Sequence, residues 1–236
     1  EGSIKNDFDI KFVTDDSRLV RPGALFVCIR HRSFDGHTAA AEALASGAAA
    51  VVTQERLGLE NELNVADSRA AYARLCAALC GHPERKLRMI GVTGTNGKTT
   101  VTTLIRNILS DSGIKTLLTG TVCNRLGEES LSSGLTTPKP PELYSLLSRA
   151  VLSGCEACVA EASSQALAQG RLEGIAFDAA VFTNITRDHL DYHGTFENYL
   201  AAKKKLFEHS EVSAVNLDDP RADEIIAASS GKNVTF

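Results

Sequence analysis

The sequence predicts an α/β protein with mostly parallel sheets, divided into a small N-terminal domain over residues 1–88 and a larger domain over residues 89–236. Two observations predict this fold class. Short apolar runs of strand length alternate with helical patterns along the chain, which is typical of parallel sheets covered by helices. A glycine-rich turn then stands between one such run and a helix, at the start of the second domain.

The N-terminal domain is expected to contain two clear strands and two helices. The strand-like runs are 24–29 and 48–53, and the helical patterns are 37–46 and 68–80. Each helical pattern is followed by glycine, the usual residue after a helix C-terminus, at Gly47 and Gly81. The polar segment 81–86 contains a proline and predicts a linker to the second domain.

The second domain begins with Met89-Ile-Gly-Val-Thr-Gly-Thr-Asn-Gly-Lys-Thr-Thr100. An apolar run enters a glycine-rich turn and Lys98 opens a helix, so backbone N–H groups, a helix N-terminus and an ammonium can converge on one anion. We therefore expect a phosphate-binding loop made of Gly94, Thr95, Asn96, Gly97, Lys98, Thr99 and Thr100. The loop departs from the general pattern at Val92, five positions before Gly97, where glycine is usual. A chance glycine-rich turn is the alternative.

The helix after the loop is expected to bury one apolar face and to end at Gly113. That face follows helical spacing through Val101, Leu104, Ile105, Ile108 and Leu109. Further strands are predicted at 115–119, 157–162, 179–185 and 214–217, with helices at 141–153, 195–209 and 221–229. Ligands of such sheets bind at the carboxyl ends of the strands, so the functional site is expected there.

Composition and charge narrow the classes of partner. The net charge of −4 argues against non-specific nucleic-acid binding, which needs a basic face. No run approaches the ~18 apolar residues of a membrane span, and the N-terminus lacks the apolar core of a signal peptide. We therefore expect a cytoplasmic protein with neither nucleic-acid nor membrane partners.

The six cysteines are interpreted as reduced and mostly buried thiols. Cys155 and Cys158 have the spacing of a metal-binding pair, which leaves zinc as the alternative. Against zinc, Cys158 lies in an apolar run and no second pair of ligands completes a set.

Glu161 is a candidate metal ligand, because it closes an otherwise apolar strand. A carboxylate there could hold a magnesium ion together with the Thr99 hydroxyl and the phosphates of a nucleotide. The alternative is an exposed acid at a strand end.

A polar turn after the strand 179–185 contains Asp188, His189, Asp191 and His193. Each histidine alone is an ordinary surface hydrogen-bonding residue. The density of ligand-type side chains beyond a strand, in a chain with a phosphate-binding loop, favours a functional role for the group.

The helix 195–209 carries three consecutive lysines at 203–205, which project about 100° apart, so that only one or two can face a site. Lys203 shares a partly apolar face with Leu200 and Phe207. A lysine there would have a lowered pKa and a reactive amine. A solvated lysine face is the alternative.

Two loops offer polar groups to a substrate. Thr136-Thr-Pro-Lys-Pro-Pro141 provides two hydroxyls on a stiff backbone, and Gln169-Gly-Arg171 provides an amide and a guanidinium. Arginine suits a carboxylate or a phosphate, which it can bind through two hydrogen bonds. Either loop could equally be structural.

Together these residues resemble the Mur ligase family over nearly the whole chain. Asp16-Ser-Arg-Leu-Val-Arg-Pro-Gly-Ala-Leu-Phe26 and Asp35-Gly-His37 are similar to its N-terminal uridine-binding domain, and Gly94-Thr-Asn-Gly-Lys-Thr99 is similar to its ATP loop. Within the family the chain looks most like the MurE branch, which adds the third residue to UDP-MurNAc-L-Ala-D-Glu. This rests on Gly120-Thr-Val-Cys-Asn-Arg-Leu-Gly127, Thr136-Thr-Pro138 and Glu161-Ala-Ser-Ser-Gln-Ala-Leu167. The MurF branch and the folylpolyglutamate synthases are the alternatives within the ligases.

The resemblance implies a small uridine-binding domain followed by a P-loop ATPase domain, and a role for each matching residue. The uridine diphosphate would be contacted by Ser17 and His31, and the muramoyl dipeptide by Thr136, Thr137, Ser163, Gln169 and Arg171. ATP and magnesium would be served by Lys98 and Thr99, with Glu161 holding the first of two ions and His189 the second. Lys203 would be carbamylated and would act in catalysis with Lys98 and His189.

The implied reaction consumes ATP to activate a carboxylate as an acyl phosphate, which the amine of a free amino acid then attacks to form an amide. The sequence leaves the identity of that amino acid open. Two positions depart from the family pattern, namely Arg30 in place of a common glycine and Gln165 in place of a histidine.

Mur ligases have three domains, and the resemblance ends partway through the second. We expect a monomeric fragment without the C-terminal ligase domain, with an incomplete central sheet and little activity of its own. Two other classes of function stay open. Another P-loop phosphotransferase would leave the N-terminal domain unexplained, and a non-catalytic nucleotide-binding or UDP-sugar-binding module would not need Lys98, Thr99, Glu161 and His189.

Overall fold

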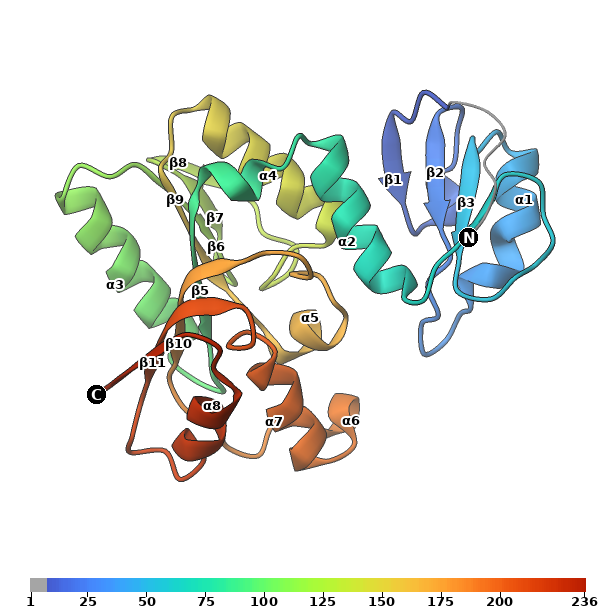
Figure 1. The fold of residues 1–236 in the computed structure, drawn as a ribbon. Coiled ribbons are helices and arrows are strands. Elements are labelled where there is room, and N and C mark those ends of the chain that lie inside the picture. The colour runs from blue at the N-terminus through green and yellow to red at the C-terminus, as the bar shows by residue number, and fades with distance from the viewer. Residues whose placement is uncertain (1–7) are drawn as a thin grey trace. The chain divides into compact units, whose positions relative to one another are not determined.

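The computed structural model describes residues 8–236 as two compact α/β units that divide between His82 and Pro83 (Figure 1). Both units are built on parallel strands, which confirms the predicted fold class. Within the described residues, no helix has both the length and the apolar character needed to cross a bilayer.

The N-terminal unit is a four-stranded parallel sheet in the order β1-β2-β3-β4. Its strands are β1 (Phe12–Thr14), β2 (Ala24–Val27), β3 (Ala50–Thr53) and β4 (Glu62–Asn64). Its helices are α1 (Ala40–Ala45), which continues a 3₁₀ turn at Gly36–Ala39, and α2 (Ser68–Leu79). Phe26, Cys28 and Val51 pack against the small residues of α1 in the core. Asp67 caps α2, because its carboxylate accepts hydrogen bonds from two first-turn N–H groups.

The second unit contains an eight-stranded sheet in the order β12-β11-β10-β5-β9-β6-β7-β8. Its strands are β5 (Arg88–Thr93), β6 (Thr116–Thr119), β7 (Asn124–Leu126), β8 (Glu129–Leu131), β9 (Ala157–Glu161), β10 (Phe177–Phe182), β11 (Ser210–Val215) and β12 (Lys232–Thr235). The pairs from β12 to β6 are parallel, whereas β6, β7 and β8 pair antiparallel. The sheet is therefore mostly parallel, with an antiparallel hairpin at one edge.

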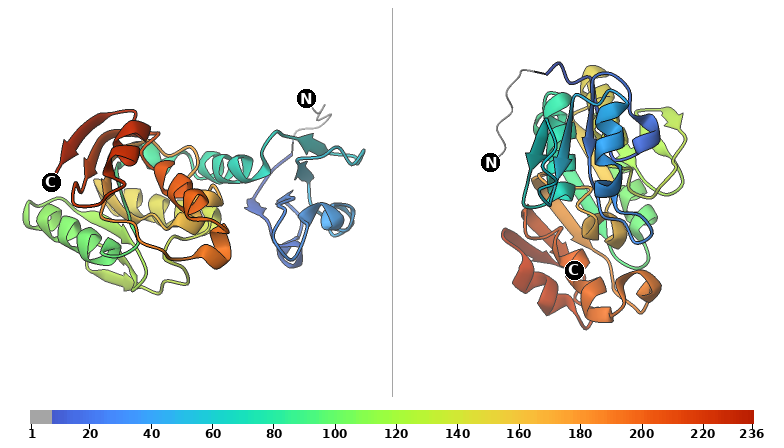
Figure 2. Two further views of the ribbon diagram at one scale, coloured as in Figure 1. Left: turned by 90° about the horizontal axis from the view of Figure 1, so that it is seen from below. Right: turned by 90° about the vertical axis from the view of Figure 1, so that its right-hand side faces the viewer.

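Helices cover this sheet unequally. They are α3 (Lys98–Asp111), α4 (Pro140–Leu152), α5 (Ser164–Ala168), α6 (Leu190–His193), α7 (Phe196–Lys204) and α8 (Ala222–Ala228). α3 lies on one face of the sheet, and α4, α5 and α7 lie on the other (Figures 1 and 2). The chain crosses the sheet one way from β5 to β6 and the opposite way afterwards, and right-handed crossovers therefore place α3 opposite the later helices. The reversal falls between the neighbouring strands β5 and β9.

Three expectations about this unit were wrong in detail. The helix predicted to reach residue 209 ends at Lys204, because Leu206 and Phe207 leave it to pack into the core, and β11 then begins at Ser210 rather than 214. The apolar face predicted to be buried on α3 is only partly so, since Leu104 and Ile108 are 55% and 65% exposed. Arg106 is buried instead, where it donates to Gly127 O and Glu128 Oε1 at the β7–β8 hairpin.

Candidate functional site

The predicted phosphate-binding loop joins β5 to α3 at the carboxyl end of the sheet. Gly94 and Gly97 have φ values of 156° and 86°, which L side chains rarely adopt, and a side chain at Gly94 would overlap Thr183. α3 begins after Gly97 without a side-chain cap, so its first-turn N–H groups face the loop as anion donors.

The segment after β10 fixes the shape of this loop. The backbone N–H groups of Thr95 and Asn96 donate to Asn184 O and Asn184 Oδ1 over 2.8 and 3.0 Å. Thr183 Oγ1 donates to Asn96 O over 2.7 Å. A segment that lies about 90 residues away in the sequence thus fixes the conformation of the loop through both backbone and side-chain hydrogen bonds.

Lys98 folds its side chain back over the loop, where Nζ donates to Gly94 O and Thr95 O over 2.9 Å each. Burial lowers the pKa of Lys98, and the nearby carboxylates of Glu161 and Asp188 oppose that shift. The amine is therefore positioned at the loop before any anion binds.

Glu161, at the end of β9, is only 1% exposed and sits among hydroxyl groups. Its Oε1 accepts from Thr99 Oγ1 over 2.9 Å and from Thr121 N over 3.0 Å, and its Oε2 accepts from Thr121 Oγ1 over 2.9 Å. The backbone of Gly120 approaches so closely that a side chain there would overlap Glu161 Oε1. The connections that leave the neighbouring strands β5 and β9 run in opposite directions across the sheet. Ligands of such folds usually bind beside this pair of strands.

The Thr99–Glu161 pair has the hard oxygen donors that magnesium prefers. Across residues 8–236, no three His, Cys, Asp or Glu side chains gather around one point. A magnesium ion beside Glu161 would therefore take its remaining oxygens from phosphates and water, as magnesium at nucleotide sites does.

The two histidines of the polar turn after β10 differ in exposure. His189 has a left-handed backbone and a half-exposed ring, with Nε2 3.6 Å from Asp188 Oδ2 and the ring edge-on to Tyr199. His193 is buried, and its Nε2 lies 3.0 Å from Ser164 Oγ. His189 is thus available to a ligand, while His193 joins α6 to α5.

Lys203 is the buried member of the lysine run, with 1% of its surface exposed, whereas Lys204 is half-buried and Lys205 exposed. Its Nζ lies 4.5 Å above the ring of Tyr199. Burial and the positive charge of Lys98 lower the pKa of Lys203 to about 7, and Asp188 partly opposes them. A large fraction of this amine is therefore neutral at physiological pH.

Tyr199 is a site residue that the sequence reasoning missed. It is completely buried, and its hydroxyl lies 2.9 Å from Thr95 Oγ1 of the loop. Its ring contacts Lys203 and the rings of His189 and His193. Its place four residues before Lys203, on the same helix face, is the signal that could have identified it.

The residues expected to bind the dipeptide are joined to the Glu161 end of β9. Thr137 Oγ1 donates to Glu161 O over 2.6 Å and accepts from Ser163 N over 3.0 Å. Arg171 donates to Thr137 O over 2.6 Å, and its other nitrogens donate to Gln169 Oε1 over 3.0 and 2.8 Å. The hydroxyl of Thr136 accepts from Thr121 Oγ1 over 3.1 Å.

Ser17 and His31 lie in the N-terminal unit, after the carboxyl ends of β1 and β2. Ser17 begins a 3₁₀ turn capped by Asp16, and His31 Nε2 lies 3.5 Å from Asp15 Oδ2. Arg30 forms ion pairs with Asp35 and Glu55 at 2.9 and 2.7 Å. Both predicted residues therefore occupy the edge of the sheet where parallel strands bind ligands.

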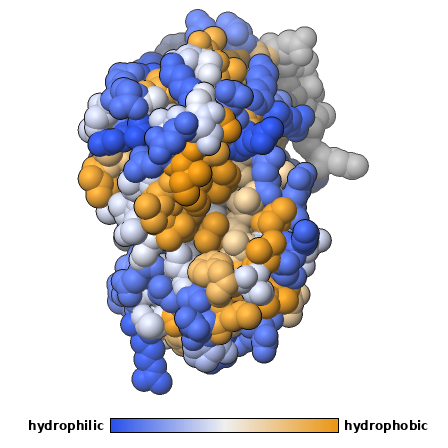
Figure 3. Space-filling model, turned by 90° about the vertical axis from the view of Figure 1, so that its left-hand side faces the viewer, coloured by the Kyte–Doolittle hydropathy of each residue, from blue (hydrophilic) through white to orange (hydrophobic). Residues whose placement is uncertain are grey.

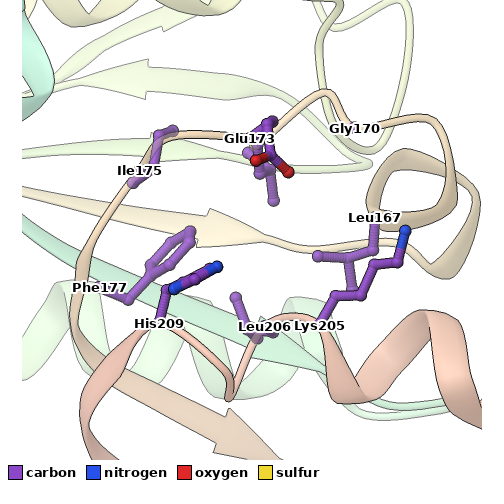
Figure 4. A pocket seen from close by; sticks show the side chains of 9 residues that line it. Leu167, Gly170, Glu173, Ile175, Phe177, Lys205, Leu206 and His209 are labelled. Carbon is purple, nitrogen blue, oxygen red and sulfur yellow. The ribbon is translucent and has the colours of Figure 1, made fainter. Parts of the chain in front are cut away.

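A separate small pocket lies at the amino end of β10 (Figure 4). Its apolar lining includes Leu167, Ile175, Phe177 and Leu206. Its polar groups come from Glu173, Lys205 and His209. Because β10 begins at Phe177 and the loop contacts follow its other end, this pocket is not part of the site at the glycine loop.

The strand–loop–helix unit and the acid on the neighbouring strand define a protein of the P-loop nucleotide-binding class. Two family models match the chain: the Mur ligase middle domain over residues 92–236, and the Mur ligase family, catalytic domain, over residues 9–79. The chain belongs to the Mur ligase family.

Individual relatives extend this comparison. The chain is 42% identical over 214 residues to the UDP-N-acetylmuramoyl-L-alanyl-D-glutamate--2,6-diaminopimelate ligase of Clostridium perfringens, covering 89% of this chain and 44% of that one. It is 41% identical over 238 residues to the ligase of the same name from Parabacteroides distasonis, covering 98% and 49%. A solved structure of a ligase of this name superimposes with a TM-score of 0.84 at 33% identity, over 99% of this chain and 50% of that one. The chain spans about half the length of these relatives.

Proposed function

We propose that this chain supplies the substrate- and nucleotide-binding domains of an ATP-dependent amide ligase that adds the third amino acid to UDP-MurNAc-L-Ala-D-Glu in peptidoglycan precursor synthesis. The observation that carries the proposal is the contact between Thr99 and Glu161 beside Lys98, next to the cluster formed by Thr137 and Arg171. The end of β9 thereby lies between a nucleotide site and an anion site. The names of the relatives supply the proposed reaction, which is the ligation of an amino acid to UDP-N-acetylmuramoyl-L-alanyl-D-glutamate.

ATP is bound by the loop. The backbone N–H groups of Gly94–Thr100 and the ammonium form of Lys98 contact its phosphates. Thr99 and Glu161 would hold a magnesium ion there, and His189 would hold a second one. Magnesium neutralises phosphate oxygens and so supplies transition-state charge stabilisation.

The reaction has two steps. A carboxylate oxygen of the UDP-linked substrate attacks the γ-phosphorus, and the bond from that phosphorus to the bridging oxygen breaks, which yields an acyl phosphate and ADP. The amine of the amino acid then attacks the acyl carbon, phosphate leaves, and the nitrogen loses a proton to give the amide. Lys98 and Arg171 stabilise the oxygens on which negative charge gathers.

Lys203 enters this scheme as a carbamate. Its neutral amine adds to the carbon of CO₂ and a proton is lost, so that the amine becomes a carbamate anion, which would help to hold the second metal ion. Burial and a pKa of about 7 support this step, because only the neutral amine can react.

Calorimetric titration tests the proposed function. UDP-MurNAc-L-Ala-D-Glu should bind the chain more tightly than UDP-MurNAc-L-Ala, because only the former presents the glutamate carboxylates to Arg171. The variant Arg171→Met, checked for native circular dichroism, should lose this preference. Equal binding of both compounds, or binding of neither to folded protein, would contradict the proposal.

A further inference from the structure

The guanidinium of Arg171 is held in a fixed plane by two acceptors. Its Nε and Nη2 donate to Gln169 Oε1 over 3.0 and 2.8 Å, and its Nη1 donates to Thr137 O over 2.6 Å. Because all three nitrogens are engaged, the planar group cannot turn without breaking a hydrogen bond. A bidentate bond to a carboxylate depends on such a plane, since two N–H groups must point at the two oxygens together.

Gln169 can hold that plane only if its own amide is held in place. A glutamine side chain has several rotatable bonds, and fixing it in one rotamer has a large entropic cost. The amide oxygen accepts from Arg171, and the amide nitrogen Nε2 donates to the hydroxyl of Tyr192 over 3.0 Å. The amide is therefore anchored at both ends, and Tyr192 supplies the second anchor.

Tyr192 lies on α6, a short helix whose two ends are fixed by the backbone. His189 before the helix and Gly194 after it have positive φ values of 51° and 78°, and Gly194 N donates to Leu190 O over 2.8 Å. The ring of Tyr192 packs edge-on against the ring of His193, with the two centroids 4.8 Å apart. A tightly hydrogen-bonded turn thus presents the tyrosine to Gln169.

The bond to Gln169 is not needed to attach α6 to its neighbours. His193 is buried, and its Nε2 lies 3.0 Å from the hydroxyl of Ser164 on α5. Asn198 Nδ2, on α7, donates to His193 O over 3.0 Å. These contacts already join α6 to α5 and α7, so the hydroxyl of Tyr192 is left with the position of Gln169 as its distinct effect.

This network lies on one side of the sheet. α5 and α7 cover the face opposite α3, and α6 packs against α7 (Figures 1 and 2). The α3 side of the unit, seen in Figure 3, instead shows apolar side chains gathered in one contiguous area. From Tyr192 the contacts run through two side chains to Thr137, which donates to Glu161 O over 2.6 Å. They end at the strand end that lies between the nucleotide site and the anion site.

We propose that Tyr192 is a positioning residue for dipeptide recognition, because its hydroxyl holds the Gln169 amide that orients the guanidinium of Arg171. The inference rests on the proposed function, in which Arg171 binds a carboxylate of the glutamyl residue of UDP-MurNAc-L-Ala-D-Glu. Tyr192 acts without touching that ligand. Removal of its hydroxyl should therefore weaken recognition of the glutamyl residue and leave recognition of the rest of the ligand unchanged.

Calorimetric titration with two ligands tests the inference. The readout is the selectivity, defined as the Kd of UDP-MurNAc-L-Ala divided by the Kd of UDP-MurNAc-L-Ala-D-Glu, which a general loss of stability does not change in folded protein. Tyr192→Phe keeps the ring and should lower the selectivity about fivefold, and Gln169→Met should lower it by at least as much. Ser164→Ala is the matched control, because it removes a hydrogen bond between α6 and α5 without touching Gln169, and it should keep the wild-type selectivity.

The double variant distinguishes action through Gln169 from a direct contact with the ligand. Tyr192→Phe should have no further effect on selectivity in protein that already carries Gln169→Met. Wild-type selectivity in Tyr192→Phe, or effects of the two substitutions that add in full, would overturn the inference. Absence of selectivity in the wild-type chain would instead contradict the proposed function.

A measurement without ligand keeps the inference testable in that case. The Nε–H signal of Arg171 in nitrogen-15 NMR spectra, identified by its loss in Arg171→Met, reports the bond to Gln169 through its rate of exchange with water. This exchange should be about fivefold faster in Tyr192→Phe and unchanged in Ser164→Ala. Equal exchange in the wild type and Tyr192→Phe would overturn the inference whatever the ligands do. Should Tyr192→Phe not fold, Tyr192→Leu replaces it under the same criteria.

Discussion

The hydroxyl of Tyr199 lies 2.9 Å from Thr95 Oγ1, so α7 and the glycine loop share a hydrogen bond between residues 104 apart in the sequence. Thr95 Oγ1 also accepts from Thr186 N over 2.9 Å. The ring of Tyr199 meanwhile lies under Lys203. One buried side chain thus connects the loop, the turn after β10 and the lysine of α7.

Tyr199→Phe should lower the stability of the second unit by about 1 kcal/mol, because it removes this hydrogen bond and leaves the ring in place. Urea unfolding of Tyr199→Phe, Thr95→Val and the double variant would measure the coupling. The double variant should cost less than the sum of the two single ones, since both remove the same bond. Strict additivity would show that the hydroxyls do not interact in solution.

Lys203→Met should stabilise the protein at neutral pH, because the folded state lowers the pKa of Lys203 from 10.5 to about 7. Between these two values the unfolded chain binds the proton and the folded chain does not. Wild-type stability should therefore rise relative to the variant by up to about 1.4 kcal/mol per pH unit as the pH increases from 7 towards 10. Below pH 7 the difference should stay constant.

Urea unfolding at pH 7, 8 and 9 in CO₂-free buffer would measure this difference. Lys205→Met is the matched control, because Lys205 belongs to the same lysine run and is exposed. If the difference in the free energy of unfolding between the wild type and Lys203→Met did not change with pH, the amine would not be buried as a neutral group.

Thr99→Val should weaken binding of ATP in the presence of magnesium by about tenfold or more, while binding of ATP without magnesium changes little. The hydroxyl beside Glu161 is the group that the variant removes, and the shape of the side chain is kept. Thr99→Ser keeps the hydroxyl and should behave as the wild type. A fluorescent ATP analogue titrated with and without magnesium would report both constants, and equal losses in the two conditions would remove Thr99 from the metal site.

The glycine loop could be predicted from sequence because its determinants are local. Gly94, Gly97 and Lys98 stand within five residues, and their spacing alone specifies a turn that presents N–H groups to an anion. Burial of Lys203 was one of the orientations that helical spacing allowed, since Leu200 and Phe207 share its face.

Other features depend on contacts between distant segments and could not be obtained in this way. Tyr199 resembles any core aromatic until its hydroxyl is seen beside Thr95. The strands β7 and β8 have three residues each, too few for a period of two to be recognised. Periodicity predicted an apolar stripe on α3, but it does not reveal that Leu104 and Ile108 stay largely exposed.

Gly120→Ala should reduce the stability of the second unit by about 1–3 kcal/mol, because the added methyl group would overlap Glu161 Oε1. Glu161 cannot move away cheaply, since it would lose its hydrogen bonds from Thr99 and Thr121. The matched control is Gly134→Ala, at which an added Cβ meets nothing within 4 Å and the backbone needs no positive φ. Thermal unfolding of both variants should shift only for Gly120→Ala, which should also lose magnesium-dependent ATP binding. Equal midpoints for the two variants would mean that the backbone at Gly120 does not press against this carboxylate.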